Sequence, residues 1–252
     1  MTAGADRPSN DRLTVSQFVA DLRAERSTFL VLTLAAVSLA VVHYGVTPGW
    51  LFPLLPASLH PLIPSVWWTG TVVIMWIALP WALARWLGFA PRDLGLGISG
   101  LRGREGIFAL LYLAVVPLIL WAATTTSFVD TYPLLRIDND VDWTWRLLVG
   151  YWLLYCLQFV GVEFFFRGFL LFTLRPRFGY AAIAIMVVPY CMIHFPKPFP
   201  EAIGAIIGGT VLGWLALRLE TIWGGVMVHV AVALTMDVLA LVQGTTGWPR
   251  TW

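Results

Sequence analysis

The sequence predicts an all-α polytopic membrane protein, a helix bundle with about seven transmembrane helices. Of its 252 residues, 59% are hydrophobic and only 12% are charged, and the mean hydropathy is +0.78. Soluble domains carry about twice that share of charge. The apolar residues form long runs, and the 14 Trp residues suit aromatic belts at the membrane interfaces. A transmembrane barrel would instead show short alternating segments separated by turns.

A transmembrane helix needs about 20 mainly apolar residues to cross the hydrocarbon core. The segments that meet or approach this length are 28–45, 66–87, 107–125, 147–172, 179–195, 201–218 and 222–243. Between the first two, TPGWLFPLLPASLHPLIPS carries five prolines and is expected to interrupt any α-helix. We therefore expect a cytoplasmic N-terminal segment at 1–27 and one transmembrane domain at 28–245.

The Lys and Arg residues between the spans predict the orientation, because cytoplasmic loops carry their excess. One side receives Arg7, Arg12, Arg23, Arg26, Arg85, Arg92, Arg102, Arg104, Arg175, Arg177 and Arg218. The other side receives Arg136, Arg146, Lys197 and Arg250. The N-terminus is thus predicted to be cytoplasmic, in a multi-pass protein of the cytoplasmic (inner) membrane. A net charge of +2 does not favour nucleic acid as a partner; the lipid bilayer is the expected environment.

The stretch VGVEFFFRGFLLF places Glu163 and Arg167 inside an apolar span. A charge at the centre of a bilayer costs about 2.5 to 3.5 kcal/mol, so intramembrane charges usually have a function. Glu163 and Arg167 are four residues apart, which puts them on one helix face where they can pair. The alternative is a purely structural ion pair that holds the bundle together.

Two histidines lie in later spans. His194 ends the span at 179–195, one turn after Tyr190, and His229 lies well inside the span at 222–243. Gly224 and Gly225 precede His229 by about one turn and allow close helix packing. A single intramembrane His is often only a polar residue satisfied by a neighbouring helix. Three helices that each supply such groups favour a convergent polar site.

This set of residues suits hydrolysis. A carboxylate or an imidazole can take a proton from water, and an imidazole or a guanidinium can stabilise an oxyanion. Glu163, His194 and His229 could also hold a zinc ion with one open position. No HExxH motif is present, so the cofactor remains open. Cys191 is a weaker candidate nucleophile, because an apolar setting keeps most thiols inert.

The pattern resembles the CAAX-protease and bacteriocin-processing family of intramembrane endopeptidases, also called the CPBP or Abi family. The family signature is Glu-Glu-x-x-x-Arg, then Phe-x-x-x-His, then His-x-x-x-Asn. The matching stretches here are VEFFFRG at 162–168, YCMIH at 190–194 and HVAVA at 229–233. The resemblance covers the motif-bearing core at 147–243.

The resemblance implies roles for several residues. Glu163 would support the reacting centre as a carboxylate, with Arg167 as its orienting partner, and His194 and His229 would act at the centre itself. Tyr190 and Phe166 would contact the substrate, a membrane-anchored protein or peptide. These assignments carry over residue by residue: catalytic Glu163, Arg167, His194 and His229; substrate-binding Tyr190 and Phe166.

The sequence departs from the family signature at two positions. Val162 stands where the family has its first Glu, and Ala233 stands where it has the final Asn. Adjacent helical residues point about 100° apart, so Glu163 is expected to need a rotated helix or a bridging water to replace that first Glu. Glu201 is a possible spare carboxylate, although an acid at a helix N-terminus is the simpler explanation.

Three functions stay open at this stage. The first is an intramembrane endopeptidase, with or without a metal ion, that cleaves the membrane-proximal or C-terminal tail of its substrate with activated water. The second is an inactive relative that binds such tails as a scaffold, chaperone or immunity protein. The third is a small proton-coupled transporter whose Glu, Arg and His line a path.

Overall fold

The computed structural model describes residues 15–54, 56–134 and 144–243. All regular elements in these ranges are helical, and six helical segments are long and apolar enough to cross a membrane. The protein is therefore an integral membrane protein built as an all-α bundle, as the composition predicts. Arg7, Arg12, Arg136 and Arg250, which entered the charge comparison, lie outside the described residues.

The six long segments agree closely with the predicted spans. They are α2 (Arg26–Tyr44), Ala57–Trp86, α5 (Glu105–Ala122), Trp145–Phe178, α10 (Phe199–Leu219) and α11 (Trp223–Val242). The second segment is made of η2 (Ala57–Leu62), α3 (Ile63–Val72), η3 (Val73–Ala78) and α4 (Leu79–Trp86). The fourth is made of α7 (Trp145–Glu163), η5 (Phe164–Leu171) and α8 (Phe172–Phe178).

The remaining predicted span, at 179–195, is shorter than expected. Helix α9 covers only Ala181–Met192, which is 12 residues, or roughly 18 Å at 1.5 Å per residue. It carries the chain back through the bundle between α8 and α10 and packs along α10 and η5. Protein neighbours therefore shield this short crossing, as its length requires.

The elements of the connections are short, and of these only η2 forms part of a long segment. The proline-rich connection forms two 3₁₀-helices, η1 (Gly49–Leu54) and η2, as expected where prolines prevent an α-helix. The others are α1 (Val15–Ala24), η4 (Pro91–Leu94) and α6 (Thr126–Thr131). Helix α6 lies in the connection after α5, and its start is capped by the Thr125 hydroxyl, which accepts a hydrogen bond from the Phe128 amide.

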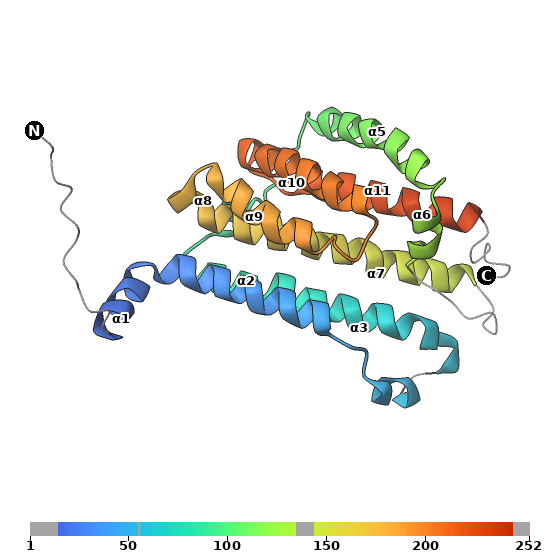
Figure 1. Ribbon diagram of the computed structural model, residues 1–252, viewed down its shortest axis with the longest axis horizontal. Helices are drawn as coiled ribbons and strands as arrows, with labels where there is room; N and C mark the ends of the chain where they lie inside the picture. The colour runs from blue at the N-terminus through green and yellow to red at the C-terminus, as the bar shows by residue number, and fades with distance from the viewer. Residues whose placement is uncertain (1–14, 55, 135–143, 244–252) are drawn as a thin grey trace, which may run out of the picture.

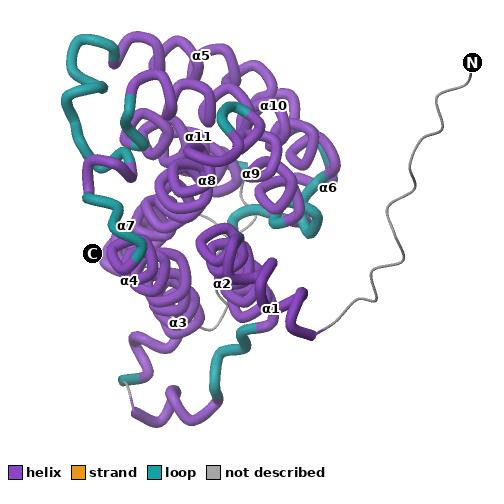
Figure 2. The backbone as a smooth tube through the Cα atoms, turned by 90° about the vertical axis from the view of Figure 1, so that its left-hand side faces the viewer, coloured by secondary structure: helices purple, strands orange, loops and turns teal. Residues whose placement is uncertain are grey.

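The motif-bearing helices form the middle of the bundle. Figure 1 shows α2 and α3 along one side, α5 along the other, and α7 to α11 between them. The end view in Figure 2 gives the same order, with α5 and α3 on opposite sides. Helix α11 packs against both α5 and α7, so any polar group on the inner faces of α7 and α11 is screened from lipid.

One end of the bundle collects most of the described basic residues, and we call it the Arg-rich end. Contacts between elements bring their termini together there: Arg177 pairs with Glu25 at 2.6 Å, and the Arg26 guanidinium lies 4.4 Å from the Trp86 ring. The basic residues at this end are Arg23, Arg26, Arg85, Arg92, Arg102, Arg104, Arg175, Arg177 and Arg218. Arg146 and Lys197 lie near the opposite end.

Two π-helical segments face each other inside the bundle. In a π-helix each amide bonds to the carbonyl five residues back, which widens the helix. The Trp76 ring of η3 stacks on the Phe165 ring of η5, with centroids 5.4 Å apart. Trp76 also meets Phe166 edge-on at 5.9 Å. The aromatic run directly after Glu163 thus lies in η5 and packs against η3.

The connection after η4, at residues 95–97, is hydrogen-bonded to the turn between α10 and α11. The Ile222 amide donates to the Gly95 carbonyl at 2.9 Å, and the Thr221 hydroxyl donates to the Gly97 carbonyl at 2.7 Å. The Trp223 indole donates to the Leu96 carbonyl at 3.0 Å. This connection therefore fixes the start of α11, the helix that carries His229.

A substitution at Gly100 tests this attachment. A Cβ atom there would lie 1.7 Å from the Leu219 carbonyl oxygen, which belongs to the backbone and cannot move aside alone. We expect Gly100→Ala to destabilise the protein by about 1 to 3 kcal/mol, the usual cost of overpacking. Tryptophan fluorescence during thermal unfolding in detergent measures the effect.

Gly106→Ala is the matched control, because a Cβ atom at this position in α5 meets nothing within 4 Å and Ala favours a helix over Gly. Its unfolding temperature should stay level or rise. Equal unfolding temperatures for the two variants would show that the connection is not held against α10.

Candidate active site

A buried ion pair stands at the junction of α7 and η5. Glu163 is the last residue of α7 and Arg167 lies in η5, and both are 0% exposed. Arg167 Nη1 donates to Glu163 Oε1 at 2.5 Å. The four-residue spacing therefore produces the predicted pair, and burial makes each charge dependent on the other.

His229 of α11 joins the same carboxylate oxygen. Its Nδ1 lies 2.8 Å from Glu163 Oε1, and its side chain is 15% exposed. Because a carboxylate only accepts hydrogen bonds, Nδ1 must be the donor, and the neutral imidazole then carries its lone pair on Nε2. The carboxylate thus fixes the His229 tautomer with Nε2 as the free base.

Gly225 makes the approach of α11 to Glu163 possible. A Cβ atom at this position would lie 2.3 Å from Glu163 Oε2, so only Gly leaves room for the carboxylate. In the part of the chain that the structure describes, Oε2 has no hydrogen-bond partner. The second oxygen therefore remains able to accept a hydrogen bond.

Tyr190 of α9 stands between the ion pair and the second histidine. Arg167 Cζ lies 4.3 Å from the centre of its ring. The Tyr190 ring centroid is 4.9 Å from that of His194 and 6.3 Å from that of His229. Both imidazoles therefore flank one aromatic ring, so residues from α9, η5 and α11 meet at a single centre.

His194 follows α9 and is held by its own turn. Its Nδ1 lies 2.8 Å from the Tyr190 carbonyl oxygen, which only accepts, so Nδ1 donates here too and Nε2 is the free nitrogen. The residue is 9% exposed. Both histidines thus share one tautomer, and each presents its Nε2 as an acceptor.

Phe166 lies behind Tyr190 instead of lining the site. It is 0% exposed and meets the Tyr190 ring edge-on at 5.1 Å. As placed, it supports Tyr190 and presents no surface to a substrate. Val162 and Ala233, at the two departures from the family signature, are 3% and 5% exposed and belong to the same apolar core cluster.

The residues as placed do not make a metal centre. In the described ranges, no group of three or more His, Cys, Asp and Glu side chains is arranged to hold a metal ion. The nitrogen that His229 turns toward Glu163 is its protonated Nδ1, and the Glu163 oxygen that it meets already accepts from Arg167. Glu163, His194 and His229 as placed therefore do not form the three-ligand zinc site that the sequence allowed.

A column of aromatic rings along α7 escaped the sequence analysis. Tyr151, Tyr155 and Phe159 follow at four-residue steps, with successive centroids 5.3 and 4.8 Å apart, and Phe159 lies 4.6 Å from the His229 ring. The four-residue spacing in YWLLYCLQF was the available signal. The column thus ends at His229, with Phe159 packed against the imidazole.

Two further carboxylates lie away from the centre. The Trp152 indole donates to buried Asp237 at 2.7 Å. Glu201, in the first turn of α10, accepts from the Tyr132 hydroxyl at 2.9 Å and lies 3.7 Å from Lys197 Nζ. Burial, and then the Glu201 charge, raises the pKa of the Tyr132 phenol, so it remains a donor. Glu201 is thus engaged elsewhere.

Cys191 also lies apart from the centre. Its Sγ contacts the Ala202 carbonyl oxygen of α10 at 3.5 Å. The thiol therefore points toward the neighbouring helix, as its low ranking among the candidate nucleophiles anticipates.

The fold and this centre define a polytopic membrane protein with a carboxylate, a guanidinium and two imidazoles gathered inside the bundle. Residues 144–235 match the family model for type II CAAX prenyl endopeptidase Rce1-like proteins. The matched region contains every residue of the buried centre. No curated protein and no solved structure matches the chain.

The buried pair makes a direct prediction for stability. Arg167→Ala leaves Glu163 as an unpaired buried charge, which costs about 3 to 5 kcal/mol, so the yield of folded protein and its unfolding temperature should fall. Size-exclusion chromatography and thermal unfolding in detergent measure both.

Arg177→Ala is the matched control, since Arg177 pairs with Glu25 at 2.6 Å but the two side chains are 52% and 43% exposed. Exposed pairs contribute only about 0 to 1 kcal/mol. If Arg167→Ala behaves as well as Arg177→Ala, the Glu163 carboxylate does not depend on its guanidinium.

Proposed function

We propose that this protein is an intramembrane endopeptidase that cleaves the membrane-proximal or C-terminal tail of a membrane-anchored protein or peptide. One observation carries the proposal: Glu163 Oε1 accepts from both Arg167 and His229 Nδ1, beside a second histidine. A buried carboxylate that holds the Nδ1 proton of an imidazole directs the basic Nε2 toward a reactant.

His229 is the general base in this proposal. Its Nε2 takes a proton from water, and the water oxygen bonds to the carbonyl carbon of the scissile peptide. When the tetrahedral intermediate collapses, the carbon–nitrogen bond breaks and the same proton passes from His229 to the leaving nitrogen. The products are a carboxylic acid and an amine, and the Glu163 carboxylate stabilises the imidazolium between the two transfers.

His194 and Glu163 orient the water. The free Nε2 of His194 accepts one of its hydrogens, and Glu163 Oε2, which has no partner among the described residues, is the second acceptor available nearby. Arg167 is 0% exposed, so it acts as a positioning residue for Glu163. This arrangement uses the position at 163 and needs no carboxylate at 162.

The family supports the substrate class. Its description names prenyl endopeptidases that act on CAAX tails, which are C-terminal and anchored to a membrane through a lipid. A site buried between helices suits a substrate that is itself held in the bilayer. We propose the cytoplasmic membrane as its location, with the Arg-rich end and the N-terminus on the cytoplasmic side.

A second candidate is an inactive relative that binds such tails without cutting them. It is favoured by Val162, a buried apolar residue where the family signature has its first Glu. Val162 cannot accept a proton, so only the histidines and Glu163 can activate water.

A cleavage assay decides between these candidates. Purified protein in detergent is mixed with quenched fluorescent peptides that carry either a prenylated CAAX tail or an unprenylated membrane tail. We expect His229→Ala to lower the rate by about 10²-fold to 10⁴-fold, the usual contribution of a general base. Glu163→Gln and His194→Ala should lower it too, with substrate still bound.

Cys191→Ala is the control, because its thiol contacts the Ala202 carbonyl and lies outside the centre; its rate should match the wild type. The Val162→Glu variant completes the series. Cleavage by Val162→Glu alone would favour the inactive relative over the endopeptidase.

Chelation tests the metal-free chemistry separately. Because the described acidic and histidine side chains form no metal-holding group, we expect cleavage to continue at the same rate after dialysis against EDTA and a zinc-specific chelator. Metal analysis of the dialysed protein accompanies the assay. Loss of activity that returns with added zinc would contradict the His229 mechanism.

A further inference from the structure

A pocket opens at the Arg-rich end, apart from the buried centre. Its volume is about 610 Å³, within the usual range for small-molecule sites. It lies between the end of α4, η4, α8 and the turn after α10. Its lining residues are Leu87, Gly88, Phe89, Arg92, Asp93, Phe172, Arg175, Pro176 and Glu220. Arg175 comes eight residues after Arg167, roughly 12 Å along the helix axis.

The walls of this pocket are fixed by local hydrogen bonds. Gly88 has a φ of +94°, a left-handed conformation that lets the chain turn out of α4. The Arg85 guanidinium then donates to the Phe89 carbonyl at 2.6 Å, and the Ala90 amide donates to Asp93 Oδ2 at 2.7 Å. The pocket is therefore formed before any ligand arrives.

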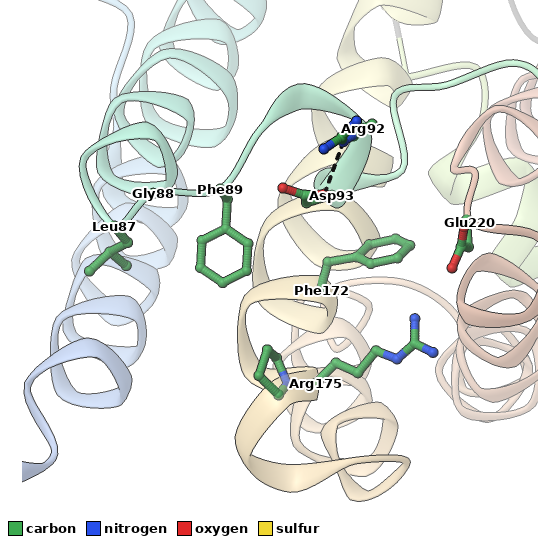
Figure 3. A pocket seen from close by; sticks show the side chains of 9 residues that line it. Leu87, Gly88, Phe89, Arg92, Asp93, Phe172, Arg175 and Glu220 are labelled. Atoms are coloured by element: carbon green, nitrogen blue, oxygen red, sulfur yellow. Dashed lines mark ion pairs between the residues drawn. The ribbon is translucent and has the colours of Figure 1, made fainter.

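The charges in the pocket are of both signs and are mostly unpaired. Arg92 makes one contact with Asp93, at 3.7 Å, and Asp93 is already used as the cap of η4. Among the described residues, neither Arg175 nor Glu220 has an ion-pair partner within 4.0 Å. Figure 3 shows the Arg175 guanidinium and the Glu220 carboxylate on the same side of the pocket, with the Phe172 ring between them and Arg92.

This arrangement matches a zwitterion. Guanidinium groups bind phosphate oxygens through paired hydrogen bonds, so Arg175, which lies on the same side of the pocket as Glu220, suits a phosphate. Glu220 suits an ammonium group attached to it, and the Phe89 and Phe172 rings offer apolar surface to the rest of the ligand. A ligand with only negative charge would meet the Glu220 carboxylate without compensation.

The location identifies the source of the zwitterion. The pocket lies where α4, α8 and α10 end, at Trp86, Phe178 and Leu219, so it is at the level of lipid head groups. Leu87 and Pro176 add apolar surface beside the spans. We propose that this pocket binds the phosphoethanolamine head group of a phospholipid from the leaflet at the Arg-rich end.

Lipid titration into the purified full-length protein tests this site. Phosphatidylethanolamine and phosphatidylglycerol of equal chain length are added in detergent, and native mass spectrometry measures the fraction of protein with bound lipid. We expect wild type to prefer phosphatidylethanolamine and Arg175→Ala to bind it about tenfold more weakly, as expected for one charged hydrogen bond. Glu220→Gln should lose the preference over phosphatidylglycerol.

Arg102→Ala is the matched control, an arginine at the same end that does not line the pocket. Equal weakening by Arg102→Ala and Arg175→Ala would overturn the site in favour of general surface charge. Preference of wild type for phosphatidylglycerol would overturn the zwitterion, and equally tight binding of soluble phosphoethanolamine would overturn the lipid. Thermal unfolding without lipid verifies that each variant folds, and Arg175→Gln is used in place of Arg175→Ala if the latter does not fold. None of these binding measurements depends on cleavage activity.

Discussion

One carboxylate oxygen organises the interior of this protein. Glu163 Oε1 accepts from Arg167 and from His229, so a single buried anion links α7, η5 and α11. Burial makes that link demanding, because removal of either partner leaves charge or hydrogen-bonding capacity unsatisfied in an apolar setting. The surrounding packing accommodates both charged groups, because Gly225 leaves space for the carboxylate and the Tyr190 ring covers the guanidinium. The site is thus part of what holds the helices together.

The same link sets the tautomer of the histidine on which the proposed chemistry depends. A carboxylate that only accepts hydrogen bonds forces His229 to donate through Nδ1, and the Tyr190 carbonyl does the same for His194. Both imidazoles then expose a basic nitrogen. Position 163 faces α11, and its carboxylate reaches His229 directly.

Polar groups in this bundle are separated by depth. In the buried centre, one oxygen of the Glu163 carboxylate accepts from both Arg167 and His229, whereas charges of both signs line the open pocket at the Arg-rich end. Arg167 and Arg175 lie on one continuous helical segment, so the segment serves both regions. A membrane protein can keep charge inside only where partners converge, but it can leave charge unpaired where water and head groups reach it.

The sequence by itself determined the helical membrane class, the approximate spans and the pairing of Glu163 with Arg167, because these depend on composition, run length and four-residue spacing within one helix. The short α9 and the aromatic column on α7 were only partly readable, since neighbouring helices decide how short a crossing can be and which face is covered. The contacts between helices could be seen only in the fold: His229 meets Glu163, Phe166 packs behind Tyr190, and Glu201 accepts from Tyr132. The His229–Glu163 and Tyr132–Glu201 contacts join residues 66 and 69 positions apart, and helix periodicity carries no information across such distances.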